Sequence, residues 1–368
     1  MKSFLSVLVF IALAAVSWGV YGPVLRAGQA DMGGSHLRPF VCVGIAYFLI
    51  AILVPGILLT LKGERGRWTA EGTIWSLAAG AAGAIGALGI ILAFTHHGSP
   101  LYVMPLVFGA APVVNTFLTM YMSKTYQQAG PVFFAGLILV IAGAVAVLVF
   151  KPAAARPAAV AEASPTVDEE ATETPANEAD EPATASGRLS LADMTMITLF
   201  VALTALSWGI YGPVLHKGQM AMAGSRLRPF ICVGISYFVI AVVVPILILA
   251  TAGEHGGFSI GGTLWSLAGG AAGALGALGI IMAFNFGGKP VYVMPLVFGG
   301  APVVNTLVTI LTAGELERVS PMFYAGLITV VAGAVTVLVF APKPAAPGHL
   351  PGERETAETQ QEASKEEE

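Results

Sequence analysis

Residues 10–150 recur as residues 200–340 at a constant offset of 190, without a gap and with about 60% of the positions identical. Ser17-Trp18-Gly19 returns as Ser207-Trp208-Gly209, and residues 111–116 return as residues 301–306. Such agreement indicates a unit that was duplicated and fused. The fold must therefore contain one structural unit twice, with the two copies packed together.

Each copy contains five apolar stretches that are long enough to cross a bilayer, since a span of the roughly 30 Å hydrocarbon core needs about 20 helical residues. Of the whole chain, 56% is hydrophobic and 11% charged, whereas soluble domains have about 25% charged residues. The sequence thus predicts an all-α integral membrane protein with ten transmembrane helices. The expected spans are 4–25, 40–61, 72–94, 101–122 and 131–150, then 194–215, 230–251, 262–284, 291–312 and 321–340.

Four segments follow from this pattern. Residues 1–150 form the first five-helix repeat and residues 194–341 the second. Residues 151–193 between them are rich in Ala, Pro, Thr and Glu, too poor in large apolar side chains to offset the entropy of ordering, and are expected to be a disordered acidic linker. Residues 342–368 have the same character and are expected to form a disordered acidic tail.

An odd number of crossings per copy predicts that the two copies have inverted topologies. The basic residues support this, because the loop with Lys62, Arg65 and Arg67 corresponds to residues 252–257, which contain no Lys or Arg. By the positive-inside rule, the N- and C-termini are expected in the cytoplasm and the acidic linker outside, with the protein integral to the cytoplasmic (inner) membrane.

The local sequence resembles the drug/metabolite transporter superfamily, particularly its EamA-like members. The resemblance lies in Pro302, the Gly314-Glu315 pair, the Ala-Gly-Leu-Ile of residues 325–328 and Gly333; the first copy has Lys124-Thr125 where the Gly-Glu pair would be. It implies two inverted five-helix repeats and a secondary transporter that works by alternating access. It also covers sugar permeases and does not select a substrate.

Several chemistries are disfavoured by what the expected spans contain. The six acidic residues outside the linker and tail fall in expected loops, so carboxylate-driven proton coupling has no support. Metal-binding spacings are absent, and no basic patch could meet nucleic acid. We therefore expect no cofactor, no metal and no enzyme activity, with the lipid bilayer and a small neutral or zwitterionic, sugar-like solute as partners.

The fourth stretch of each copy is the first candidate for a substrate site. Prolines remove a backbone donor and disrupt a helix one turn earlier, and the freed carbonyl groups can line a cavity. Amide and hydroxyl side chains follow within a turn and suit hydroxyl recognition, although they could equally join helices. The expected helix breaks are Pro105, Pro112, Pro295 and Pro302, and the expected substrate contacts are Asn115, Thr116, Asn305 and Thr306.

Aromatic residues form the second candidate set. A Trp and a Tyr three residues apart share a helix face and could stack on a substrate ring, but an aromatic belt at the membrane interface is an equally simple interpretation. The residues are Trp18, Tyr21, Trp208, Tyr211, Tyr102 and Tyr292.

Other features have mainly structural interpretations. Arg38 and Arg228 begin the second helices and are expected to extend towards the interface, with a gating role as the alternative. Glycines in the third and fifth helices are expected to allow close packing, and those of the fifth helices could also support a homodimer. The alternatives to a transporter are a passive channel or a non-transporting membrane scaffold; an intramembrane enzyme would need a cluster of reactive groups that the sequence lacks.

Overall fold

The computed structural model describes residues 2–150, 190–286, 288, 290–313 and 319–342. Throughout these residues the secondary structure is helical, with no strand. The helices are α1 (Lys2–Asp31), α2 (Leu37–Lys62), α3 (Ala70–Thr95), α4 (Pro100–Ser123) and α5 (Pro131–Val149), then α6 (Leu191–Ala221), α7 (Leu227–Phe238), α8 (Val244–Thr251), α9 (Ile260–Asn285), α10 (Pro290–Ala313) and α11 (Pro321–Phe340). A short 3₁₀ turn, η1 (Tyr126–Gln128), precedes α5, and a π-helical segment, η3 (Val239–Val243), joins α7 to α8.

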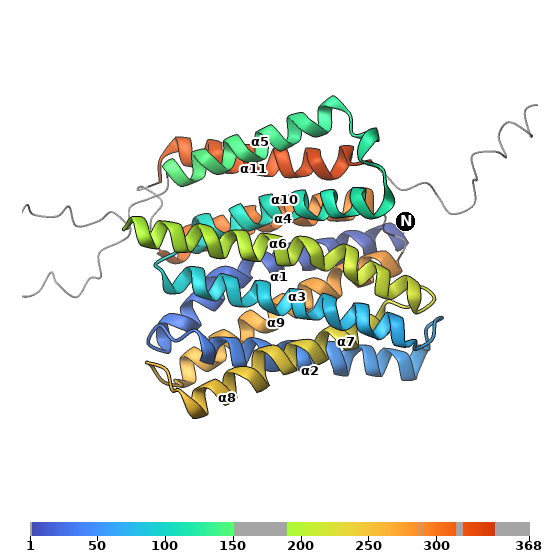
Figure 1. Cartoon of the computed structure of the whole chain (residues 1–368), viewed down its shortest axis with the longest axis horizontal. Coiled ribbons are helices and arrows are strands. Elements are labelled where there is room, and N and C mark those ends of the chain that lie inside the picture. The colour runs from blue at the N-terminus through green and yellow to red at the C-terminus, as the bar shows by residue number, and fades with distance from the viewer. Residues whose placement is uncertain (1, 151–189, 287, 289, 314–318, 343–368) are drawn as a thin grey trace, which may run out of the picture.

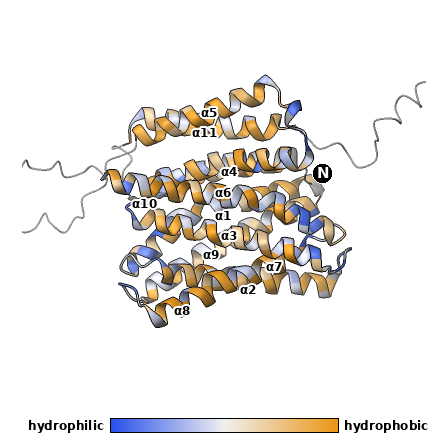
Figure 2. Ribbon diagram, in the orientation of Figure 1, coloured by the Kyte–Doolittle hydropathy of each residue, from blue (hydrophilic) through white to orange (hydrophobic). Residues whose placement is uncertain are grey.

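Nine helices in the described part of the chain are long and apolar enough to cross a membrane, with α7, η3 and α8 counted as one. In α10, the tenth expected span, the described apolar stretch Leu296–Thr312 is shorter. Figure 2 shows hydrophobic residues along the helices and hydrophilic residues towards their ends. An integral membrane protein is the class that this arrangement defines.

Helix starts follow from local chemistry. Proline occupies the first turn of α4, α5 and α11, where a missing N–H costs nothing. Thr69 and Ser259 cap equivalent helices, accepting hydrogen bonds from the backbone N–H groups of Gly72 (3.0 Å) and Gly262 (2.9 Å).

The predicted helix breaks in the fourth stretches are not observed. α4 continues as one helix through Pro105 and Pro112, and α10 has the same uninterrupted bounds around Pro295 and Pro302. An irregular segment occurs elsewhere, in η3 directly before Pro245. The equivalent α2 is regular around Pro55. A π-helical turn changes the hydrogen-bond register next to a residue that cannot donate, but the structure gives no reason why only one copy has it.

Every helix of one half packs on the other half. α1 packs on α9 and α3 on α6, while α2 contacts α7, α4 contacts α10, and α5 contacts α11. Exchanging equivalent helices leaves this scheme unchanged, so the halves are related by a pseudo-two-fold axis. The start of α1 and the end of α11 lie at one end of the bundle, and the end of α5 and the start of α6 lie at the opposite end (Figure 1).

The glycines of the fifth helices join α5 to α11 within one chain. A Cβ atom on Gly136 would lie 3.0 Å from the backbone nitrogen of Val337, and one on Gly333 would lie 2.6 Å from that of Val140. Because these stripes are occupied by intramolecular packing, they are not available as the homodimer surface that the sequence allowed.

Candidate functional site

A cavity of about 280 Å³ lies between the two halves. Many of its lining residues are aromatic, and both halves contribute equivalent residues, among them Trp18 and Trp208. Polar side chains line it towards the end of α6, at His216, Gln219 and Arg226. The end near residues 216–226, where His216 lines the cavity and is exposed, is termed the open end below, and the opposite end, near residues 26–36, where Gln29 is fully buried, the closed end.

The two tryptophans are fixed by glycines of the opposite half. Trp18 Nε1 donates to the carbonyl oxygen of Gly273 at 3.1 Å, and Trp208 Nε1 donates to that of Gly83 at 3.2 Å. A Cβ atom at Gly276 or at Gly86 would overlap the respective indole ring. The glycine-rich faces of α9 and α3 therefore serve to admit the indoles, a role that glycine spacing alone does not reveal.

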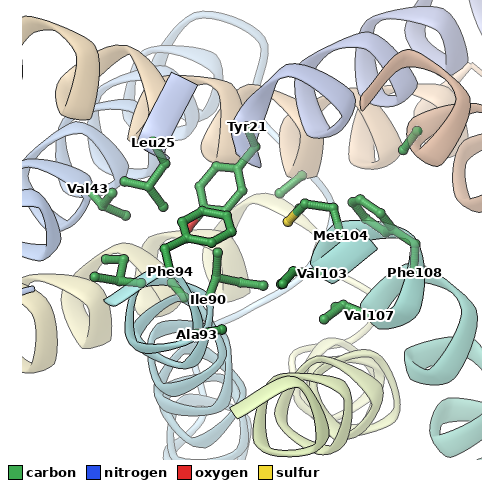
Figure 3. Close-up of a cluster of buried hydrophobic side chains, with 14 of the residues drawn as sticks. Tyr21, Leu25, Val43, Ile90, Ala93, Phe94, Val103, Met104, Val107 and Phe108 are labelled. Carbon is green, nitrogen blue, oxygen red and sulfur yellow. The ribbon is translucent and has the colours of Figure 1, made fainter. Parts of the chain in front are cut away.

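Phe108 lies among the indole rings. Its ring centroid is 6.3 Å from that of Trp18 and 6.3 Å from that of Trp208, within the range of favourable aromatic contacts. Phe298 completes this group, 5.7 Å from Trp18. Figure 3 shows Phe108 with Tyr21 and Met104 in the buried cluster around which the helices pack.

Four tyrosines from the two halves line the cavity beside the tryptophans, namely Tyr21, Tyr47, Tyr211 and Tyr237. The rings of Tyr47 and Tyr237 stack at 3.8 Å with an interplanar angle of 4°, and Tyr47 donates to the carbonyl oxygen of Gly273 at 3.2 Å. Tyr21 lies 6.1 Å from Trp208, and its buried hydroxyl has no hydrogen-bond partner among the described residues. Tyr47 and Tyr237 were missed by the sequence analysis because only the packing of α2 against α7 brings them to the cavity.

The structure thus brings five of the expected site residues to one cavity, namely Trp18, Tyr21, Asn115, Trp208 and Tyr211. Lying at the centre of the bundle, they do not form an aromatic belt. Tyr102 is buried elsewhere, near the His97 carbonyl group. The side chain of Tyr292 lies outside the described residues, so its expected role stays a prediction.

The two asparagines have different environments despite their equivalence in sequence. Asn115 lines the cavity. Asn305 is fully buried, and its Nδ2 donates to the carbonyl oxygen of Pro100 at 2.7 Å. Thr116 and Thr306 are also buried and are not among the residues that line the cavity. The two asparagines therefore differ, because Asn115 faces the cavity whereas Asn305 is enclosed by other residues.

At the closed end, side chains of α1 donate hydrogen bonds to groups near the end of α3. Arg26 Nη1 donates to the carbonyl oxygen of Phe94 at 2.9 Å, and Gln29 Nε2 donates to that of Ile91 at 3.2 Å and to Thr95 Oγ1 at 2.8 Å. The equivalents of Arg26 and Gln29 are His216 and Gln219, which instead line the cavity. The two ends of the bundle are thus in different states.

A carboxylate from a loop of one half docks on the other half at each end. Glu254 accepts from the backbone N–H of His36 at 2.7 Å and pairs with Arg38 at 3.2 Å. Glu64 accepts from the backbone N–H of Arg226 at 2.8 Å and pairs with Arg228 at 3.5 Å.

The sequence analysis placed Glu64 and Glu254 in loops and assigned them no role. It expected Arg38 and Arg228 to extend towards the membrane interface. Instead, these residues join the two halves. The sequence analysis missed the contacts because residues so far apart in the sequence leave no local pattern. Burial opposes ionisation of Glu254, but hydrogen bonds from Ser35 and from the His36 and Leu37 amides outweigh it and hold the pKa of Glu254 below its usual value.

No cluster of three or more metal-binding side chains occurs in the part of the chain that the structure describes. Cys42 and Cys232 are free and buried. No protein-family model matches the chain. No curated protein matches it either.

Proposed function

We propose that the chain is a secondary transporter that moves a small organic metabolite by alternating access. In this proposal the halves are inverted repeats of the drug/metabolite transporter type, as the EamA-like resemblance suggests. The termini are cytoplasmic, the acidic linker lies outside, and the membrane is the cytoplasmic (inner) one. The pseudo-two-fold contact scheme and the opposite ends of the bundle at which the halves begin support the inversion.

The observation that carries the proposal is the difference between equivalent groups at the two ends. Arg26, Gln29 and Asn305 bind backbone carbonyl groups, whereas His216, Gln219 and Asn115 line the cavity. Since the two copies share about 60% of their residues, including Gln29/Gln219 and Asn115/Asn305, each half can adopt the arrangement of the other at these positions. Exchanging the arrangements would close the open end and open the closed one, which is the change that alternating access requires.

The exchange supplies named contacts for the second state. Asn115 would donate to the carbonyl oxygen of Pro290, the counterpart of Pro100. Gln219 would donate to that of Ile281, the counterpart of Ile91. Both groups are of the right type for these bonds, so the same chain can stabilise either end.

A passive channel is the main alternative, and it would need a path open at both ends. The contacts of Arg26, Gln29 and Asn305 oppose this, because they hold one end while the cavity reaches towards the other. A non-transporting scaffold would have no need for a cavity that is shared between the two halves.

The test is counterflow in proteoliposomes. Metabolites are first screened for thermal stabilisation of the purified protein, because a ligand of the folded state raises its apparent stability. The radiolabelled hit is then followed in vesicles preloaded with the unlabelled compound. We expect saturable exchange that falls about tenfold or more in Asn115→Ala and Asn305→Ala, since each removes a group used in one state.

Thr329→Ala is the matched control. Thr329 is partly exposed on α11 and bonds only to its own helix in the described contacts. Exchange that is unchanged in both asparagine variants would remove the proposed site. Non-saturable flux without counterflow would favour the channel.

A further inference from the structure

Each end of the bundle has one arginine and one histidine at positions that the two copies exchange. Arg26 in the first copy corresponds to His216 in the second, and His36 corresponds to Arg226. Arg26 and His36 therefore lie at the closed end, and His216 and Arg226 at the open end. The substitutions between the copies alter which of these two positions has the permanent charge, but each end keeps one guanidinium group there, in addition to that of Arg38 or Arg228.

Neither Arg26 nor Arg226 forms a salt bridge with a carboxylate in the described residues. Glu64 is engaged by the Arg228 guanidinium and by Ser225 and backbone amides. Glu254 is engaged in the same way by Arg38 and His36. The loop acids thus have charged partners other than Arg226, whose guanidinium group forms no salt bridge in the described part of the chain.

The contacts of the Arg226 side chain are with neutral groups. Its Nη1 donates to Asn285 Oδ1 at 3.0 Å, and its guanidinium carbon lies 5.7 Å from the centre of the Phe284 ring. Arg226 lines the cavity together with Phe284, and it makes no salt bridge among the described residues. A guanidinium with spare donors at the mouth of an apolar cavity is suited to bind a carboxylate.

The walls favour an apolar body behind such a group. No Asp or Glu occurs among the described residues that line the cavity. The lining instead offers the faces and edges of Trp18, Trp208 and Phe108, and the volume of about 280 Å³ suits a compound with one ring. With a cation at the mouth and low-dielectric walls, the electrostatic potential inside favours an anion.

We infer that the substrate is a small organic monoanion with a flat apolar body, whose carboxylate or similar group binds Arg226. This inference rests on the proposed transport function and names its substrate class. It differs from the neutral or zwitterionic, sugar-like solute expected from sequence, because a neutral solute would make no use of the Arg226 charge and a flat apolar body matches the aromatic walls. Arg26, now bound to the Phe94 carbonyl group, has the corresponding role when the opposite end opens.

The test uses three compounds of one shape and different charge, namely phenylacetate, phenylacetamide and phenethylammonium. Binding to the purified full-length protein is followed by tryptophan fluorescence, since Trp18 and Trp208 line the cavity. We expect phenylacetate to bind about tenfold or more tightly than the neutral amide, as one charge-assisted hydrogen bond allows, and phenethylammonium to bind least.

The decisive variant is Arg226→Gln, which should abolish the preference for phenylacetate over phenylacetamide. Arg226→Lys should retain part of it. The matched control is Arg65→Gln, which removes an exposed charge from the loop that carries Glu64 without touching the cavity. Thermal unfolding of each variant shows that it is folded, and the Trp18→Phe, Trp208→Phe double variant should lose the ligand-dependent signal.

Equal binding of phenylacetate and phenylacetamide, or a preference for phenethylammonium, would overturn the inference. So would a preference for phenylacetate that persists in Arg226→Gln. Counterflow distinguishes the anion inference from the transport proposal. Saturable exchange of the neutral or cationic compound would support transport and contradict an anionic substrate. Arg226-dependent binding of phenylacetate without any exchange would support the anion site and contradict the transport proposal.

Discussion

Asn305 donates a 2.7 Å hydrogen bond to the carbonyl oxygen of Pro100, a residue of the other half, in a site that excludes solvent. Its counterpart Asn115 faces the cavity. One amide thus fixes the closed end while the other stays available for a ligand. The difference makes the two positions separable by experiment.

Asn305→Ala is expected to lower the free energy of unfolding by about 1–2 kcal/mol, because it leaves a buried carbonyl oxygen without its donor. Asn115→Ala should cost clearly less in the absence of ligand, because Asn115 lines the cavity. Thermal or denaturant unfolding in detergent measures both. Equal losses in the two variants would contradict the structural difference between them.

Gly276→Ala and Gly86→Ala are each expected to destabilise the protein by about 1–3 kcal/mol, since the added methyl group overlaps an indole ring inside packed helices. Both should also disturb the cavity, which the same indoles line, and so weaken ligand binding. Gly56→Ala is the control, because a Cβ atom there meets nothing within 4 Å. A helix gains stability from Ala at such a position, so a loss in the control equal to that in the other two would argue against the overlap.

The loop between α8 and α9 should undock in acid. The pKa of Glu254 is held below its ordinary value of 4.5, so the folded state favours its ionised form. That contribution is complete above pH 4.5 and is lost as the pH falls through the lower folded-state value. We expect hydrogen exchange at the amides of His36 and Leu37 to become severalfold faster across this range.

Ser35, His36 and Arg38 are the polar and charged groups that face this carboxylate in the described structure. Glu254→Gln should show fast exchange already at neutral pH and little further change in acid. An acid-induced acceleration of the same size in the variant would assign it to another group.

Cysteines at Leu191 and Ala341 should react with an impermeant reagent from opposite sides of the membrane. Leu191 begins α6, and Ala341 follows α11 at the other end of the bundle. A background of Cys42→Ala and Cys232→Ala removes the native thiols, which are buried and small enough to replace. Labelling of both positions from one side would remove the inverted topology, and the proposed exchange of states with it.

The expected spans agree with the described helices to within a few residues in most places, for example 72–94 against Ala70–Thr95. Hydropathy predicts them well because every backbone group in lipid must be bonded within its own helix. The largest error concerns the prolines of α4 and α10. A proline inside a packed helix need not interrupt it, because neighbouring helices can supply the missing partners.

Site residues were predictable only as far as equivalence between the copies allowed. Trp18 and Trp208 could be selected from a repeated motif, and both reach the cavity. Tyr47 and Tyr237 had no motif, and Arg226 differed from its counterpart His36, so repetition pointed away from it. Their shared position depends on contacts of α2 with α7 and α9, which lie far from α2 in the sequence.

The sequence by itself determined the duplicated unit, the helical class and the segments that can lie in a membrane, because these depend on local composition and on length. Only the tertiary structure decided that equivalent residues differ, with Asn305 and Arg26 bound to carbonyl groups while Asn115 and His216 line a cavity. Two similar sequences can specify many of the same contacts. Which of those contacts form at each end depends on how the two halves are packed.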